Sequence, residues 1–181
     1  DDGTKNMKEL FSEKVFDNPK PVLLIKRIIE HTCEKNDLVL DFFGGSGTTG
    51  QAILELNTND WDLRLLMVQV PEKTNNKNFP KISDVCTERL RRTISKISEQ
   101  NKQQKLDKKK FNLGFKVFKL TKSNYKIWED VQDEEKLKDQ LKLFEDPLVE
   151  NYKDINVIYE IIIKEGYSLN SKIETLEEKP N

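Results

Sequence analysis

The segment "DLVLDFFGGSGTTGQAILELN", residues 37–57, predicts a strand, a glycine-rich turn and a helix in direct succession. Its apolar run ends at Asp41, immediately before the turn. A bare backbone at the carboxyl end of a first parallel strand lets a ligand approach closely. The helix that begins there offers N–H groups that have no intrahelical partner. This segment therefore predicts a small-molecule site at the turn.

Two classes of ligand remain open from these residues alone. A phosphate could accept hydrogen bonds from the free N–H groups, but the turn lacks the lysine of a Walker A loop. Gly45, Gly47 and Gly50 have Gly-x-Gly-x-x-Gly spacing, although short glycine patterns arise easily by chance. Asp41 at the strand tip is better suited to a cationic ligand, such as a sulfonium compound that carries an ammonium group. A helix-capping carboxylate is the structural alternative for Asp41.

The segments around the turn predict an α/β fold with part of a doubly wound sheet. After Pro19 and Pro21, apolar residues recur at helical spacing up to Cys33. The run "NDLVLDFF" lacks alternation, which predicts a strand covered on both faces. A second strand is predicted in "LRLLMVQV" and a long amphipathic helix over 80–100. Helix, strand, helix, strand, helix is half of a doubly wound sheet.

Three regions are expected along the chain. Residues 1–100 form the cofactor-binding half of a larger domain, and 101–126 form a basic linker that includes a strand at "GFKVFKL". Residues 127–181 form a small, acidic and mostly helical region, in which "DINVIYEIIIKEG" is either a helix or a strand. The net charge of −1 thus conceals a basic block between two acidic ones.

Composition limits the cellular compartments and the kinds of site that are expected for this protein. Hydrophobic and charged residues each make up 35% of the chain, and no apolar run approaches the ~20 residues that cross a bilayer. The start of the chain has no signal-peptide pattern. Cys33 and Cys86 lack metal-ligand spacing and are expected to be buried thiols. These features predict a cytoplasmic protein with no metal site and no membrane contact.

The turn also resembles a known motif. "DFFGGSGTT" resembles the Asp-Pro-Phe-x-Gly-Ser-Gly-Thr-Thr motif with which DNA amino-methyltransferases bind S-adenosylmethionine. "FDNPKPVLLIKRII", which precedes it, resembles the second cofactor-binding motif, and this order is that of the permuted β class. The later segments "RLLMVQVPE", "ISDVCTERLRR" and "VIYEIIIKEGYSL" resemble the tail of the modification (Mod) subunit of Type III restriction–modification systems. Mod subunits methylate adenine, so the resemblance implies adenine as the target base.

The resemblance implies a role for each cofactor-site candidate. Asp41 would lie near the methionine part of the cofactor, and Phe43 beside its adenosyl group. Gly45 and Gly47 would allow backbone approach. Residues expected near the carboxylate are Lys20, Ser46, Thr48 and Thr49, of which Ser46 or Thr48 would also cap the helix. Either Gln69 or Glu72 would hold the ribose hydroxyls.

The methyl-accepting half of the family's site is not found in this sequence. The family binds the flipped target base through an Asp-Pro-Pro-Tyr tetrapeptide, and "EDPL" and "DNPK" are the nearest strings here. In the permuted class the tetrapeptide lies upstream, so the chain is expected to be a C-terminal fragment that is inactive alone. Half a sheet should also leave an uncovered apolar face. The alternatives are a β-class cytosine methyltransferase fragment and a non-catalytic assembly module.

The resemblance further implies double-stranded DNA, a second Mod subunit and the restriction (Res) subunit as partners. The expected contacts with DNA phosphates are Arg89, Arg91, Arg92, Lys108, Lys109 and Lys110. Their binding to DNA should weaken steeply with salt. The alternative is a solvated helix face followed by a lysine-rich loop. The acidic residues 127–181 are the candidate for protein contacts.

Overall fold

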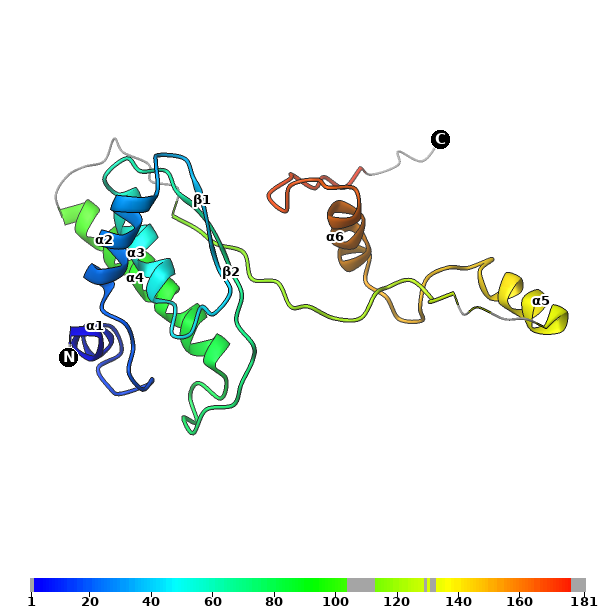
Figure 1. Ribbon diagram of the computed structural model, residues 1–181, viewed down its shortest axis with the longest axis horizontal. Coiled ribbons are helices and arrows are strands. Elements are labelled where there is room, and N and C mark those ends of the chain that lie inside the picture. The colour runs from blue at the N-terminus through cyan, green and yellow to red at the C-terminus, as the bar shows by residue number, and fades with distance from the viewer. Residues whose placement is uncertain (1, 104–112, 129, 131–132, 177–181) are drawn as a thin grey trace. The chain divides into compact units, whose positions relative to one another are not determined.

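The computed structural model describes residues 2–103, 113–128, 130 and 133–176 (Figure 1). The chain divides into two compact units, Asp1–Val117 and Phe118–Asn181. In the described residues, unit 1 contains α1 (Asp2–Phe11), α2 (Val22–Thr32), β1 (Leu38–Asp41), α3 (Thr48–Asn57), β2 (Arg64–Met67) and α4 (Ile82–Gln103). Unit 2 contains α5 (Glu134–Leu143) and α6 (Asp154–Lys164). None of the described helices is long and apolar enough to cross a membrane.

The two strands of unit 1 form a parallel pair. Leu38 pairs with Arg64 and Asp41 with Met67, so the tips of both strands lie at the same edge. Helix α3 connects them as a crossover, which places the glycine-rich turn at the carboxyl end of β1. The predicted α/β class is confirmed. The described residues show this two-stranded sheet and not a full doubly wound one.

One face of the sheet is covered and the other is open. Val39 and Leu65 pack against a buried cluster contributed mainly by α2 and α3, and Figure 1 shows the helices of unit 1 gathered beside the strands. On the opposite face, Leu38, Leu40 and Leu66 are each about half exposed, at 57%, 47% and 47%. The prediction that β1 is covered on both faces is therefore wrong for this chain, whereas the expected open apolar face is present.

Helices α3 and α4 approach each other closely at Gly50. A Cβ atom on Gly50 would lie 2.5 Å from Cδ2 of Leu90. Leu54, Leu90 and Ile97 form a buried cluster at the same contact. The absence of a side chain at Gly50 thus sets the distance between the two helices.

Two local predictions need correction. Helix α3 begins at Thr48, and its N-cap is Gly47 in a left-handed conformation with no side-chain cap, so neither Ser46 nor Thr48 caps the helix. The segment "GFKVFKL" contains no strand. The long helix predicted over 80–100 is confirmed as α4, and "DINVIYEIIIKEG" is helical in α6.

Unit 2 is held together around Glu160 on α6. The Glu160 carboxylate accepts hydrogen bonds from the Ser123 hydroxyl and from the backbone N–H of Asn124, the latter at 2.7 Å. Lys164 lies 2.9 Å from the same carboxylate. Phe118 and Tyr159 meet edge to face at 5.1 Å. These contacts attach residues 118–125 to α6.

Acidification is expected to loosen unit 2 through Glu160. Hydrogen bonds from Ser123, Lys164 and Asn124 lower the pKa of Glu160 from 4.5 to about 2. A carboxyl group with a lowered pKa stabilises the fold above its ordinary pKa, and the contribution disappears as pH falls through the folded value. Trp128 fluorescence should therefore change on acidification between those two values. Glu160→Gln should abolish that component, whereas the control Glu165→Gln should retain it.

Candidate functional site

The glycine-rich turn is fixed by hydrogen bonds within itself and to the residues that follow β2. The N–H of Gly44 donates to the carbonyl of Val68 at 3.0 Å, and the N–H of Gly47 donates to Gly44 at 2.7 Å. The N–H of Gly45 donates to Oε1 of Gln69 at 2.7 Å. A segment without regular secondary structure therefore has one defined shape, which a binding site requires.

Asp41 organises the side of the turn next to β1. Its Oδ1 accepts from the N–H of Phe43 at 3.0 Å, and its Oδ2 accepts from the Thr49 hydroxyl at 2.6 Å. The contact with α3 is made through a side-chain hydroxyl, so Asp41 does not cap the helix backbone. Two lone-pair positions remain on a half-buried carboxylate. Asp41 thus retains capacity to accept hydrogen bonds from a cationic ligand.

The turn requires glycine at two of its positions. Gly45 and Gly47 have φ values of 51° and 81°, in the left-handed region. A Cβ atom on Gly47 would lie 3.2 Å from both the carbonyl oxygen and Sγ of Cys86.

Burial raises the pKa of Cys86 to about 11, so its thiol stays protonated near neutral pH. The prediction of a buried thiol is confirmed for Cys86, while Cys33 is only partly buried.

Arg89 of α4 lies beneath the turn and is fully buried. Its Nη1 donates to Oγ of Ser46 at 2.9 Å and to Oγ1 of Thr48 at 2.8 Å, and its Nε donates to Oε1 of Gln51 at 2.7 Å. Burial lowers the pKa of Arg89 to about 10, which still leaves it charged near neutral pH. The predicted contact of Arg89 with DNA phosphates is therefore wrong, because the guanidinium is not at the surface.

Ser46 and Thr48 are expected near the carboxylate of the cofactor, but the hydroxyls of both contact Arg89. Ser46 and Thr48 are 3% and 6% exposed, and both accept hydrogen bonds from the guanidinium. They face the protein interior and not a surface ligand. Sequence analysis could have identified Arg89 as buried, since it lies four residues from Val85 and from Thr93 on the buried stripe of α4.

The remaining cofactor candidates differ in how close they lie to the turn. Phe43 is 90% exposed at the turn. Gln69 touches the turn through Gly45, and its Nε2 donates to the carbonyl of Val70 at 2.7 Å. Lys20 and Glu72 are exposed, and no described hydrogen bond joins either side chain to the turn. Of the two ribose candidates, Gln69 is the one brought to the site.

The candidate contacts with DNA are not equivalent. Arg91 is exposed, with an ion pair to Glu88 at 3.9 Å. Arg92 donates to the carbonyl of Leu10 at 3.0 Å and stacks over the Phe11 ring at 4.6 Å, so it helps to attach α1. Lys108, Lys109 and Lys110 lie outside the described residues. Within the described part of the chain, no group of three potential metal ligands is present.

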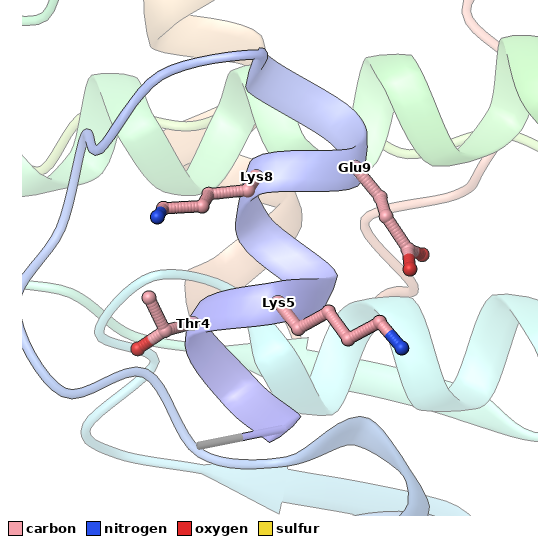
Figure 2. Close-up of a pocket in the computed structure, with 4 residues that line it drawn as sticks. All are labelled: Thr4, Lys5, Lys8 and Glu9. Atoms are coloured by element: carbon pink, nitrogen blue, oxygen red, sulfur yellow. The ribbon is translucent and has the colours of Figure 1, made fainter.

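A shallow depression on α1 lies apart from this site. It is lined by Thr4, Lys5, Lys8 and Glu9, which all belong to one helix (Figure 2). Figure 2 shows Thr4 and Lys8 projecting to one side of α1, with Lys5 and Glu9 on the other. No residue of the glycine-rich turn contributes to its lining, so the depression is not part of the candidate site.

The chain is similar in sequence to known DNA methyltransferases. Residues 2–61 match a family described as DNA methylase. The chain is 33% identical over 137 residues to the Type III restriction-modification enzyme StyLTI Mod subunit of Salmonella typhimurium, covering 72% of this chain and 20% of the relative. It is 33% identical over 149 residues to the EcoP15I Mod subunit of Escherichia coli, covering 71% and 21%.

A Type II relative also matches. The chain is 36% identical over 94 residues to the methyltransferase M.KpnI of Klebsiella pneumoniae, covering 48% of this chain and 22% of the relative. The chain spans about a fifth of the length of each of these three relatives. It is similar to part of a DNA methyltransferase of the Mod kind.

Proposed function

We propose that this chain supplies cofactor-binding elements to a Type III DNA methyltransferase that methylates the adenine amino group. The observation that carries the proposal is the fixed turn between Asp41 and α3, with exposed Phe43 beside it. The similarity to Mod subunits supports it. When bound, S-adenosylmethionine would supply an electrophilic methyl group.

The charges at the turn suit the two ends of an amino-acid tail. Asp41 offers carboxylate oxygens to an ammonium group. The N-terminus of α3 has no side-chain cap, so its N–H groups and helix dipole favour a carboxylate. Phe43 and Gln69 are the candidates to contact the adenosyl part. Lys20 stays a candidate for the carboxylate.

The chain alone is proposed to bind the cofactor without transferring its methyl group. It contains no Asp-Pro-Pro-Tyr sequence to hold the target amine. The open apolar face formed by Leu38, Leu40 and Leu66 supports a role as part of a larger fold, since an uncovered sheet face of this kind marks a contact surface.

Calorimetry with S-adenosylhomocysteine and a transfer assay with labelled S-adenosylmethionine and adenine-containing duplex test this proposal. We expect measurable binding with no labelled DNA. Methyl transfer by the chain alone would refute the fragment interpretation. An absence of binding together with a stable dimer would favour the assembly-module alternative.

The proposed partners are double-stranded DNA, a second Mod subunit and a Res subunit. The exposed Arg91 is the described candidate for a phosphate contact. The acidic residues 127–181 are the candidate for protein contacts, because their charge disfavours phosphates. Neutralising one phosphate-contacting cation should reduce the salt slope of DNA affinity by about one.

Arg91→Gln is therefore expected to flatten the dependence of DNA affinity on salt, measured by fluorescence anisotropy from low to moderate salt. Arg92→Gln should have a smaller effect on the slope and a larger one on stability, because Arg92 binds Leu10 and Phe11. An unchanged slope for Arg91→Gln would assign Arg91 to a solvated helix face.

A further inference from the structure

We infer that the loop between β2 and α4, residues 72–82, is a phosphate-binding element that contacts the backbone of a DNA duplex. The identity of the phosphate source rests on the proposed function, in which DNA is the substrate. S-adenosylmethionine carries no phosphate group, so the cofactor is not that source. In Figure 1 the chain extends beyond the end of β2 to form this loop before it enters α4.

Two lysines face each other at the base of the loop. Lys73 and Lys81 form an antiparallel β-bridge, flanked by hydrogen bonds from Thr74 N–H to the Pro80 carbonyl and from Ile82 N–H to the carbonyl of residue 72, each at 2.9 Å. The lysines are therefore a non-hydrogen-bonded pair, the kind in which the two side chains lie closest and on one face.

This pairing of like charges is unfavourable unless an anion binds to it. Like charges directly opposite each other destabilise a strand pair. Lys73, Lys81 and the intervening Lys77 are all exposed, and none of them takes part in the ion pairs of the described residues. A phosphate against the bridge would relieve the repulsion and accept charge-assisted hydrogen bonds from the ammonium groups.

The acidic side chains near the loop leave it with an excess of positive charge. Residues 72–82 contain three lysines and one acidic residue, Glu72. The Asp84 carboxylate accepts a hydrogen bond from the backbone N–H of Lys81 at 3.0 Å and forms no described ion pair with a lysine of the loop. The positive charge is thus available to an external anion.

Side chains inside the loop fix its shape. The Thr74 hydroxyl donates to the carbonyl of Phe79 and accepts from the N–H of Asn76, the latter at 3.1 Å. Oδ1 of Asn76 accepts from the N–H groups of Asn78 at 2.8 Å and of Phe79 at 3.2 Å. The Phe79 ring meets the Phe11 ring edge to face at 5.5 Å. A preorganised loop loses less entropy when its lysines bind.

Both ends of the loop adjoin the glycine-rich turn. Gln69, three residues before the loop, accepts a hydrogen bond from the N–H of Gly45 at 2.7 Å. Cys86, four residues after it, lies against Gly47. A target base must leave the duplex to reach a methyl donor at the turn. The backbone phosphates next to that base then come to the edge of the site from which the loop extends.

The salt dependence of duplex affinity tests this role. Lys73→Gln with Lys81→Gln should reduce the salt slope by about two, measured by fluorescence anisotropy, because each phosphate-contacting cation contributes about one. The same variant should unfold at an equal or higher urea concentration, followed by Trp61 in the core of unit 1, because the repulsion across the bridge is removed. Lysines with a purely structural role would not combine weaker binding with undiminished stability.

Two further variants separate the position of the lysines from net charge and from loop shape. Lys136→Gln with Lys138→Gln removes the same charge from exposed positions on α5 and should leave the salt slope unchanged. Thr74→Val keeps the charge and loosens the loop. It should weaken duplex binding about two- to tenfold at an unchanged slope, as expected for the loss of one hydrogen bond.

The outcomes distinguish this inference from the cofactor proposal. An unchanged slope in the Lys73 and Lys81 variant, an equal reduction in the α5 control, or no duplex binding by the unaltered chain at low salt overturns the role of the loop. Inorganic phosphate that displaces the duplex more strongly than chloride at equal ionic strength would make the loop a site for free phosphate. Selective loss of duplex binding without any S-adenosylhomocysteine binding would overturn the cofactor site and leave the phosphate contact standing.

Discussion

Gly47→Ala is expected to lower the unfolding free energy of unit 1 by about 2–5 kcal/mol, because a left-handed alanine costs about 1–2 kcal/mol and a crowded Cβ about 1–3 kcal/mol. The residue has a φ of 81°, and the new Cβ would press on the backbone and Sγ of Cys86 at 3.2 Å. Urea denaturation followed by Trp61 fluorescence measures the change, since Trp61 packs against the core of unit 1.

Gly166→Ala isolates the backbone part of that cost. Gly166 has a φ of 73°, and no atom lies within 4 Å of its added Cβ. Trp128 fluorescence should report a loss of about 1–2 kcal/mol in unit 2, from the left-handed conformation alone. If Gly47→Ala were no more harmful than Gly166→Ala, the contact with Cys86 would not constrain the turn.

Asp41→Asn is expected to weaken binding of S-adenosylhomocysteine about ten- to a hundredfold, because a charge-assisted hydrogen bond contributes about 1.5–3 kcal/mol. Asparagine preserves the size of the side chain and one acceptor for Phe43 or Thr49, so stability should fall much less than affinity. Calorimetry gives the affinity, and thermal unfolding gives the stability.

The matched control for this change is Asp62→Asn, on an exposed loop where asparagine tolerates the observed φ of 52°. It should alter neither affinity nor stability appreciably. Equal binding of S-adenosylhomocysteine by Asp41→Asn and by the unaltered chain would remove Asp41 from the site. Binding of methylthioadenosine, which has the adenosyl group without the amino-acid tail, should be nearly insensitive to the change if Asp41 meets the ammonium group of the tail.

Sequence patterns predicted the local elements of unit 1 well. Prolines at 19 and 21 mark the entry to α2, and the apolar stripe from Ile82 onward marks α4. Gly45 and Gly47 mark the turn in the sequence, because a left-handed backbone conformation is adopted readily only by glycine. Periodicity and backbone preferences are local properties, so a single sequence contains them.

The predictions that failed depend on contacts between distant segments. An arginine on a basic helix is usually solvated, and although Arg89 lies on the buried stripe of α4, its polar partners Ser46, Thr48 and Gln51 are 38 to 43 residues away and have no local sequence signature. The apolar run at 37–43 resembles a doubly covered strand because its open face is as apolar as its packed face. The alternating residues of "GFKVFKL" show strand propensity, but no described strand pairs with them.

The close approach of α3 and α4 makes the residue tolerated at position 50 depend on the residue at position 90. A methyl group on Gly50 would collide with Leu90, so alanine is tolerable at position 50 only where position 90 holds a smaller side chain. Residues 50 and 90 should therefore covary among homologous chains. Where they do not, the angle between the two helices must have shifted, and Arg89, which neighbours Leu90, would have moved relative to the turn above it.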